Sequence, residues 1–452
     1  MKRIHFIAIG GSAMHNLAIS LKQQGFLVSG SDDEIFEPSK SRLENLGLLP
    51  AQFGWFPENI TQDLDMIVLG MHARVDNPEL LKAQELGIRV VSYPEFLYHA
   101  TENKMRIVIA GSHGKTTTTA MIMHVLKSKN IIFDYMVGSH IEGFDNMTGL
   151  FKQSKVAVFE GDEYLSSPID RRSKFLWYKP HIVVITGIEW DHINVFPTFV
   201  SYMDTFKQLV ETMPKNGKII WYRNDKNIAS IIQSCQTKTS NIQYVGFDWE
   251  QDKGNTYVHY NSQRYPMTLF GDHNFQNLNA AFLVCKEAFG FSDTDFFNAV
   301  ATFKGANRRL QIVKEATNPV YYDFAHAPSK VRATVAAVRQ LYPDKKITAC
   351  LELHTFSSLN KNFIPYYKDT LNFADRAFVY FNPNVLKHKG MPLLEDNYII
   401  SNFNQKSLAV CTNNMEMFNI LRKDWENGAI LLLMSSGNFG GVDPIKWADE
   451  LK

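Results

Sequence analysis

Paired cysteines and long apolar runs are both missing from this sequence. The 452 residues include only four cysteines, and no two of them form a C-x-x-C pair. The four are Cys235, Cys285, Cys350 and Cys411. The cysteine pattern therefore argues against a disulfide framework or a zinc knuckle, and we expect a cytoplasmic protein in a reducing environment. No run approaches the roughly 18 apolar residues that a membrane-spanning helix needs.

An excess of charge of one sign is missing as well. Lys plus Arg number 47 and Asp plus Glu number 46, so we expect neither a nucleic acid nor a membrane as a partner. The apolar segment 4–9 runs directly into Gly10 and Gly11, which favours a first strand over a signal peptide. Composition leaves the oligomeric state open.

Short apolar runs that alternate with helical patterns fill the sequence instead. This alternation predicts an α/β fold of mainly parallel sheets, and the length predicts about three domains at roughly 150 residues each. We place the domains at residues 1–104, 105–310 and 311–452. The expected strands include 4–9, 27–30, 66–70, 89–91, 106–110, 156–160, 182–186, 320–323, 347–353, 376–380 and 429–434. The expected helices include 13–24, 80–86, 116–128 and 329–341.

A glycine-bearing turn joins the expected strand 106–110 to the expected helix 116–128. Its sequence is Gly111-Ser112-His113-Gly114-Lys115-Thr116-Thr117. Backbone N–H groups at a helix N-terminus bind phosphate oxygens, a lysine neutralises them, and a threonine hydroxyl can bind Mg²⁺. Ile109 stands where the full Walker pattern has glycine, so the motif is a shortened one. We predict ATP as the ligand, and we expect the Lys115 charge to have no structural partner. The alternative is a strand–turn–helix with an incidental lysine.

Acidic side chains follow the next two expected strands. Glu160-Gly161-Asp162-Glu163 comes after the first, and Glu189-Trp190-Asp191-His192 after the second. The carboxyl ends of parallel strands face the ligand crevice, and hard oxygen ligands suit Mg²⁺. We therefore predict Glu160 as a metal ligand, with a solvated acidic loop as the alternative. For His192, a metal or catalytic role and a structural role stay equally open.

Three further groups of residues give weaker signals. His273, Asn274 and Asn277 can hydrogen-bond an adenine edge or a phosphate, and the segment 305–309 offers guanidinium groups such as Arg309. Alone, these would be a helix cap and a surface basic pair. Gly10 and Gly11, with Asp32 after the second strand, could form a dinucleotide site, although the G-x-G-x-x-G spacing is absent.

Taken together, the motifs resemble those of the Mur ligase family, ATP-dependent amide-forming ligases of peptidoglycan synthesis. The resemblance covers essentially the whole chain. Its remaining parts are the segment 322–328, with the sequence Tyr-Asp-Phe-Ala-His-Ala-Pro, and the segment 29–32. The latter resembles the domain of family members that bind UDP-N-acetylmuramate. The fold so implied has a Rossmann-like N-terminal domain, a P-loop ATPase domain and a Rossmann-like C-terminal domain that receives the incoming amine.

The resemblance also implies a reaction and its residues. The muramate carboxylate attacks the γ-phosphate of ATP, and the amine then attacks the resulting acyl phosphate. Lys115 and His192 are the implied catalytic residues, with ATP and Mg²⁺ as cofactors. The implied ATP contacts are Gly111, Ser112, His113, Gly114, Lys115, Thr116, Thr117, His273, Asn274, Asn277, Arg309 and Asp323. The implied UDP contacts are Gly10, Gly11, Ser12, Ser31 and Asp32. The implied metal ligands are Thr116, Glu160 and His192.

Two segments, 170–175 and 434–441, are similar to one branch of the family. That branch joins L-alanyl-γ-D-glutamyl-meso-diaminopimelate to UDP-N-acetylmuramate, and the branch that uses L-alanine is the alternative. The departure from the family pattern at 352–358 leaves the incoming amine open, and the departures at Gly187 and Tyr322 leave their effect on activity open. A dehydrogenase would leave the phosphate motif unexplained, and we expect no nicotinamide cofactor to bind. A non-catalytic nucleotide-binding protein is the more distant alternative.

Lys207 lies fifteen residues after His192. At this spacing several Mur ligases have a carbamylated lysine that helps to bind a second Mg²⁺, whereas the favoured branch generally lacks it. A helix lysine more often extends its stem over apolar neighbours into solvent. Both interpretations stay open.

Overall fold

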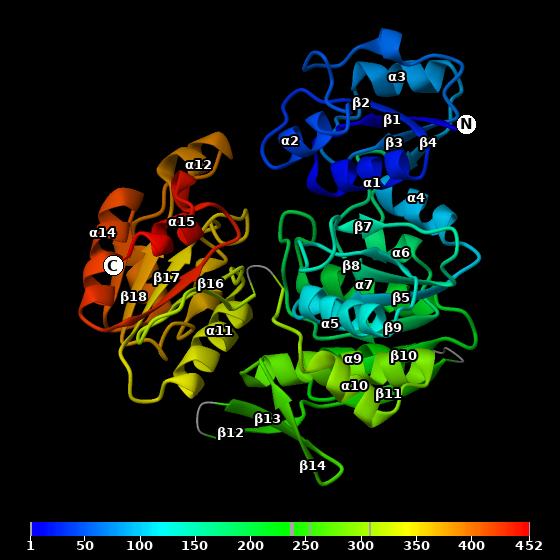
Figure 1. Cartoon of the computed structure of the whole chain (residues 1–452). Helices are drawn as coiled ribbons and strands as arrows, with labels where there is room; N and C mark the ends of the chain where they lie inside the picture. The colour runs from blue at the N-terminus through cyan, green and yellow to red at the C-terminus, as the bar shows by residue number, and fades with distance from the viewer. Residues whose placement is uncertain (1, 236–238, 253–254, 307–308, 452) are drawn as a thin grey trace. The chain divides into compact units, whose positions relative to one another are not determined.

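The chain forms an α/β structure with four sheets in the residues that the computed structural model describes, which are 2–235, 239–252, 255–306 and 309–451 (Figure 1). These residues divide into two compact units. The first comprises the residues up to 188, 200–245 and 280–300, and the second comprises 189–199, 246–279 and the residues from 301 on.

The N-terminal sheet has four parallel strands in the order β2-β1-β3-β4. Its strands are β1 (Arg3–Ile7), β2 (Leu27–Ser31), β3 (Met66–Leu69) and β4 (Val90–Ser92). The helices of this part are α1 (Ser12–Gln23), α2 (Ser39–Glu44), η1 (Pro57–Asn59), α3 (Pro78–Glu85) and α4 (Tyr93–Ala100). α3 covers one face of the sheet and α1 the other, which is why the central strands are apolar on both faces (Figure 1).

The central sheet has seven strands in the order β11-β10-β9-β5-β8-β6-β7, and only β7 is antiparallel to its neighbour. Its strands are β5 (Met105–Ala110), β6 (Asp134–Met136), β7 (Thr148–Gly149), β8 (Val156–Gly161), β9 (Ile182–Ile185), β10 (Lys218–Tyr222) and β11 (Ser240–Tyr244). Its helices are α5 (Lys115–Ser128), α6 (Lys174–Trp177), α7 (Phe199–Glu211), α8 (Lys226–Ser234) and α10 (Asp293–Val300). β5, β8 and β9 stand side by side, so their carboxyl ends share one edge.

A small antiparallel sheet was not expected from the sequence. It contains β12 (Asp248–Asp252), β13 (Asn255–Tyr260) and β14 (Gln263–Met267), and α9 (Asp272–Phe289) follows it. Asn261 and Ser262 both have positive φ angles, 49° and 61°, which is the backbone of a type I′ hairpin turn. The usual Asn-Gly signal for this turn is absent, so the hairpin escaped the sequence analysis.

The C-terminal sheet has six strands in the order β15-β16-β20-β17-β18-β19, and all but β15 run parallel. Its strands are β15 (Gln311–Lys314), β16 (Val320–Asp323), β17 (Ile347–Glu352), β18 (Arg376–Tyr380), β19 (Leu408–Cys411) and β20 (Ile430–Met434). The helices are α11 (Pro328–Leu341), η2 (Ile364–Tyr367), α12 (Pro383–His388), α13 (Asp396–Phe403), α14 (Asn414–Glu426), η3 (Phe439–Gly441) and α15 (Pro444–Asp449). Alternate residues of the strands pack on α11 and on α14 with α15, so both faces are buried.

Every strand and helix expected from the sequence is present, with ends that differ by at most two residues. Differences of two residues occur at the start of α3 and at the end of β1. β1 ends at Ile7 rather than Ile9 because the chain turns at Ala8, whose φ is 67°. The predicted α/β fold with mainly parallel sheets is therefore confirmed. The domain boundaries at 104 and 310 stay predictions.

Candidate active site

The predicted phosphate loop connects β5 to α5. Gly111 and Gly114 have φ angles of 124° and 74°, in the region that favours glycine. A Cβ atom on Gly111 would lie 2.9 Å from the backbone nitrogen of Thr186, at the end of β9. The Ser112 amide donates to the Gly187 carbonyl at 2.8 Å. The loop therefore passes close to the neighbouring strand and enters α5 at Lys115, where backbone amides are available to an anion.

Lys115 has structural partners, contrary to expectation. Its Nζ donates to the Glu163 carboxylate at 2.8 Å and to the Gly111 carbonyl at 2.6 Å. Burial acts to lower the pKa of Lys115, but the carboxylates of Glu163, Asp162 and Glu160 outweigh burial and raise it. The lysine therefore carries its charge at neutral pH and is held over the loop before any ligand binds.

Glu163 and Tyr202 are site residues that the sequence analysis missed. The Glu163 carboxylate is only 1 % exposed and accepts a hydrogen bond from the Tyr202 hydroxyl at 2.9 Å. That hydroxyl also lies 2.9 Å from Ser112 Oγ, in the loop itself. Glu163 belongs to the acidic run already noted after β8, and its burial was the missing information. Nothing in the sequence around Tyr202 pointed to the loop.

Thr116 and Glu160 meet at the start of α5, as predicted for a metal site. The Thr116 hydroxyl donates to Glu160 Oε1 at 2.9 Å, and the Gly138 amide donates to Oε2 at 2.7 Å. No cluster of three or more His, Cys, Asp or Glu side chains able to bind a metal occurs among the described residues. A hydroxyl with one carboxylate suits Mg²⁺, which usually completes its shell with water and substrate phosphates. The residues present therefore fit the ion.

The segment 170–177 is fixed locally and joined to the acidic run. The Asp170 carboxylate accepts from Arg172 Nε at 2.9 Å and from Trp177 Nε1 at 2.6 Å. Burial acts to raise the pKa of Asp170, but these hydrogen bonds and the Arg172 charge lower it. Lys174 Nζ donates to Asp162 at 2.6 Å. One of the two segments that resemble a branch of the family is thus joined to the acidic run that follows β8.

Gly10 and Asp32, which the family resemblance implies as UDP contacts, come together in the N-terminal sheet. The Gly10 amide donates to Asp32 Oδ2 at 2.7 Å, and a Cβ on Gly10 would lie 2.8 Å from Ile35. Gly11 precedes α1 and Ser12 begins it, so the helix N-terminus is exposed here. The Ser31 side chain is buried beneath them, and its carbonyl accepts the Ala8 amide at 2.9 Å.

Asp32 supplies a test of pH dependence. Burial raises its pKa to about 6 and Asp33 adds to this effect, while the Gly10 amide acts in the opposite direction. In an unfolded chain this carboxyl has the ordinary pKa of about 3.9, so the folded chain binds the proton more tightly. The free energy of unfolding is therefore higher at low pH and falls as the pH rises through 6.

Asp32→Asn is therefore expected to stabilise the chain at about pH 8, by at most about 3 kcal/mol, and to leave its stability unchanged at about pH 4. Thermal unfolding of the two proteins without ligand measures the difference. The exposed Asp76→Asn serves as the control and is expected to show no such pH dependence. An equal effect of Asp32→Asn at both pH values would contradict the expectation.

His192 lies in the second unit, in a loop of its own. Its φ is 55°, and its amide donates to Asp191 Oδ1 at 2.7 Å. Burial acts to raise the pKa of Asp191, but His192, Lys330 and His326 lower it. Burial lowers the pKa of His326 to about 3, with Lys330 adding to the effect. A role of His192 beside Thr116 and Glu160 stays a prediction.

The other predicted nucleotide contacts also lie in the second unit. His273, Asn274 and Asn277 begin α9, where Asn274 Nδ2 donates to the Phe270 carbonyl at 2.9 Å. The Arg309 guanidinium lies 4.8 Å from the centre of the Phe324 ring, next to Asp323. The Asp323 carboxylate accepts the amides of Leu310 and Ala325 at 2.5 and 2.6 Å. Residues 307 and 308 of the predicted arginine segment lie outside the described residues.

The departures from the family pattern have structural explanations of different kinds. A Cβ on Gly187 would have no atom nearer than 3.7 Å, so the structure leaves room for a side chain there. Tyr322 is 1 % exposed and packs in the apolar core of the C-terminal sheet beside Phe439. Lys207 is half-buried on α7 and lies within electrostatic reach of Cys235. Its carbamylation stays a prediction.

A second group of polar side chains lies at the carboxyl ends of β17 and β20 in the C-terminal sheet. Glu352 is 1 % exposed and accepts from the Ser435 hydroxyl and, at 2.9 Å, from the Phe439 amide. His354 Nδ1 lies 3.7 Å from the same carboxylate. A Cβ on Gly437 would lie 2.6 Å from the His354 ring, so only glycine fits. The second segment noted for its similarity to one branch, 434–441, thus packs against 352–358.

None of the helices in the described ranges is both long and apolar enough to span a bilayer.

Sequence comparisons identify relatives over nearly the whole chain. The model of the Mur ligase family, catalytic domain, matches residues 3–105, and that of the Mur ligase middle domain matches 109–285. The chain is 31 % identical over 398 residues to the UDP-N-acetylmuramate–L-alanine ligase of Caldicellulosiruptor bescii, covering 84 % of this chain and 83 % of the relative. It is 29 % identical to the ligase of the same name from Clostridium botulinum (strain Loch Maree), over 97 % and 95 % of the two chains.

Solved structures of two kinds of ligase share this fold. The murein peptide ligase of Psychrobacter arcticus gives a TM-score of 0.71 at 22 % identity over all of both chains. The UDP-N-acetylmuramate–alanine ligase of Thermotoga maritima gives 0.71 at 19 % identity, over 100 % of this chain and 98 % of its own. The UDP-N-acetylmuramate:L-alanyl-γ-D-glutamyl-meso-diaminopimelate ligase of Neisseria meningitides is 28 % identical to this chain. It gives a TM-score of 0.61 over 67 % of this chain and 98 % of its own. The chain belongs to the Mur ligase family, whose members are ATP-dependent ligases that form amide bonds.

Proposed function

We propose that this protein uses ATP to join UDP-N-acetylmuramate to L-alanyl-γ-D-glutamyl-meso-diaminopimelate. In this proposal residues 1–104 bind the UDP substrate, 105–310 bind ATP with Mg²⁺, and 311–452 receive the amine. The main support is the arrangement of Lys115 over the phosphate loop, with Thr116 and Glu160 adjoining it.

The proposed reaction begins when the muramate carboxylate attacks the γ-phosphorus of ATP, which releases ADP and leaves an acyl phosphate. Lys115 and the amides of the 111–117 loop stabilise the charge on the transferring phosphoryl group. The free amine of the peptide then attacks the acyl carbon, and phosphate leaves as the amide forms. Mg²⁺, held by Thr116 and Glu160, would neutralise phosphate charge when bound.

Two observations bear on the incoming amine. The segments 170–175 and 434–441 resemble the tripeptide-using branch, and both are fixed in place, one beside Asp162 and the other beside Glu352. L-Alanine is the second candidate, because the relatives from Caldicellulosiruptor bescii and Clostridium botulinum are named for it and align in sequence over 84 % and 97 % of this chain.

A competition assay separates the two amines. With UDP-N-acetylmuramate and ATP held constant, the tripeptide is expected to exceed L-alanine by about tenfold or more in kcat/KM, a difference of about 1.4 kcal/mol in transition-state binding. Mass spectrometry of the UDP product identifies which amine was joined. Rapid use of L-alanine without tripeptide ligation would establish the second candidate. If neither the tripeptide nor L-alanine led to ADP release, both candidate functions would be contradicted.

A further inference from the structure

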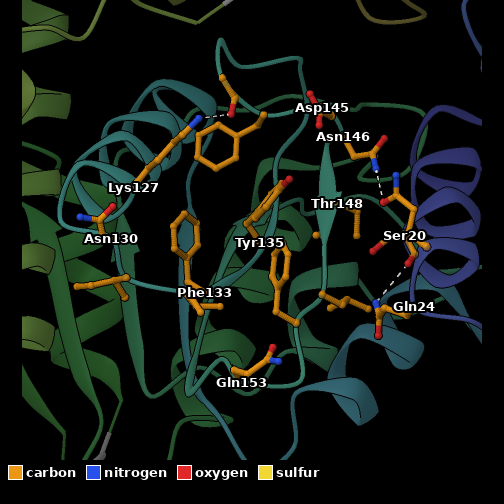
Figure 2. Close-up of a pocket in the computed structure, with 18 residues that line it drawn as sticks. Ser20, Gln24, Lys127, Asn130, Phe133, Tyr135, Asp145, Asn146, Thr148 and Gln153 are labelled. Carbon is orange, nitrogen blue, oxygen red and sulfur yellow. Dashed lines mark hydrogen bonds between the residues drawn. The ribbon is translucent and has the colours of Figure 1, made fainter.

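A cavity of about 710 Å³ lies in the first unit, between the end of α1 and the segment 130–153. Figure 2 shows Lys127 and Asn130 on one side of the cavity, Ser20 and Gln24 on the other, and aromatic rings between them. The volume lies within the range of about 300–1,000 Å³ that is usual for small-molecule sites. None of the predicted UDP, ATP or metal contacts lines it.

Four aromatic rings form the wall of this cavity. Tyr135 lies at the centre, with ring centroids 5.8 Å from Phe133, 5.1 Å from Phe144 and 6.4 Å from Phe151. Tilted and edge-on pairs at these distances are favourable and hold the rings in place. A flat apolar ligand can therefore pack against a preformed aromatic surface.

The hydroxyl of Tyr135 is the unexplained polar group of the wall. Tyr135 is 6 % exposed, and its Oη makes no hydrogen bond to any residue in the described part of the chain. This oxygen is not among the fully buried, unpartnered side-chain atoms of the described residues, so it is accessible from the cavity, where a ligand or water can accept its proton. Burial, followed by the charge of Asp145, raises its pKa to about 12, so the hydroxyl stays a donor at neutral pH.

Two glycines leave space for the side chains that line the cavity. A Cβ on Gly149 would lie 2.7 Å from Cζ of Tyr135 and 3.0 Å from the Phe151 ring. A Cβ on Gly143 would lie 2.7 Å from Lys127 Nζ, which caps the Phe144 ring at 5.1 Å from its centre. Any larger residue at position 149 would therefore push the aromatic rings out of their present places.

Charge in the lining is balanced. Lys127 is the one cation and Asp145 the one anion among the lining residues, and the rest are neutral. The lining therefore has no net charge that would attract an ionised ligand of either sign, which is consistent with an uncharged ligand.

We propose that this cavity is a binding site for a flat, uncharged heteroaromatic molecule whose ring edge accepts a hydrogen bond from Tyr135. The site is separate from the phosphate loop, because Lys127 and Asn130 are at the far end of α5 from Lys115. Thirteen residues of helix at about 1.5 Å each separate the two ends by about 20 Å.

The probe for this proposal is 2-quinolinone, a flat and neutral bicycle with a ring carbonyl. Its binding to the full chain is measured by saturation-transfer NMR and calorimetry. The wild-type protein is expected to bind it, Tyr135→Phe at least about fivefold more weakly, and Gly149→Ala not at all. Quinoline-2-carboxylate, its charged counterpart, is expected to bind more weakly to the wild-type protein.

The exposed Tyr366→Phe is the matched control and is expected to bind the probe as the wild type does. Because the Tyr135 hydroxyl has no partner in the described chain, Tyr135→Phe should not lower the melting temperature, so weaker binding cannot result from misfolding. Saturating ATP is expected to leave probe binding unchanged. Absence of binding to the wild type, equal binding by Tyr135→Phe, tighter binding of the carboxylate, or displacement by ATP would each overturn the proposal.

Discussion

Replacing Lys115 with methionine is expected to lower kcat/KM for ATP by about 10³-fold, or about 4 kcal/mol of transition-state stabilisation. Methionine keeps much of the stem volume but removes the charge that lies over the loop. The same change leaves Glu163, which is 1 % exposed, without its cation. We therefore also expect a lower melting temperature, because breaking a buried ion pair on one side is destabilising. Coupled ATP turnover and thermal unfolding measure the two effects.

A second variant separates the lost function from the lost stability. Lys115→Met combined with Glu163→Gln removes the stranded charge while keeping an acceptor for the Tyr202 hydroxyl. This double variant is expected to regain most of the melting temperature but none of the turnover. Near wild-type turnover in either variant would show that the loop does not bind the transferred phosphate through Lys115.

Lys104 offers a closely matched control in the same unit. Its side chain is 15 % exposed, against 14 % for Lys115, and it pairs with the buried Asp134 at 2.5 Å. Lys104→Met therefore breaks a similar ion pair away from the phosphate loop. It is expected to lower the melting temperature and to leave kcat/KM unchanged.

Glu160→Gln is expected to raise the Mg²⁺ concentration for half-maximal activity by about tenfold or more, the lower end of what outer-shell partners alone contribute to metal affinity. The glutamine oxygen can still accept from the Gly138 amide and its NH2 group can donate to the Thr116 hydroxyl, so local hydrogen bonding is kept while the anionic ligand is lost. Calorimetric titration of ADP with and without Mg²⁺ gives a readout that does not depend on turnover. The metal-dependent gain in ADP affinity should disappear in the variant.

The exposed Glu102→Gln makes the same chemical change away from the loop and is expected to alter neither measurement. If Glu160→Gln kept the wild-type Mg²⁺ dependence, the Thr116–Glu160 pair would be a structural contact only.

The sequence by itself determined the strands and helices named in the sequence analysis and the loop that joins β5 to α5. Strands such as β9 and β20 are apolar throughout because both faces of a parallel sheet are covered, and this pattern is visible in one dimension. The Gly111–Thr117 motif was equally visible, since its glycines and lysine are adjacent in the chain. The small antiparallel sheet was missed because its Asn261–Ser262 turn lacks the usual glycine.

Only the tertiary structure decided which side chains meet. Lys115 and Glu163 are 48 positions apart in the chain, and Tyr202 is a further 39 away, yet the side-by-side pairing of β5, β8 and β9 joins them at one sheet edge. The open wall around Tyr135 likewise depends on Gly149 across the β6–β7 pair. Local patterns report burial along one element, whereas ion pairs and cavities depend on strand order, which a single sequence does not specify.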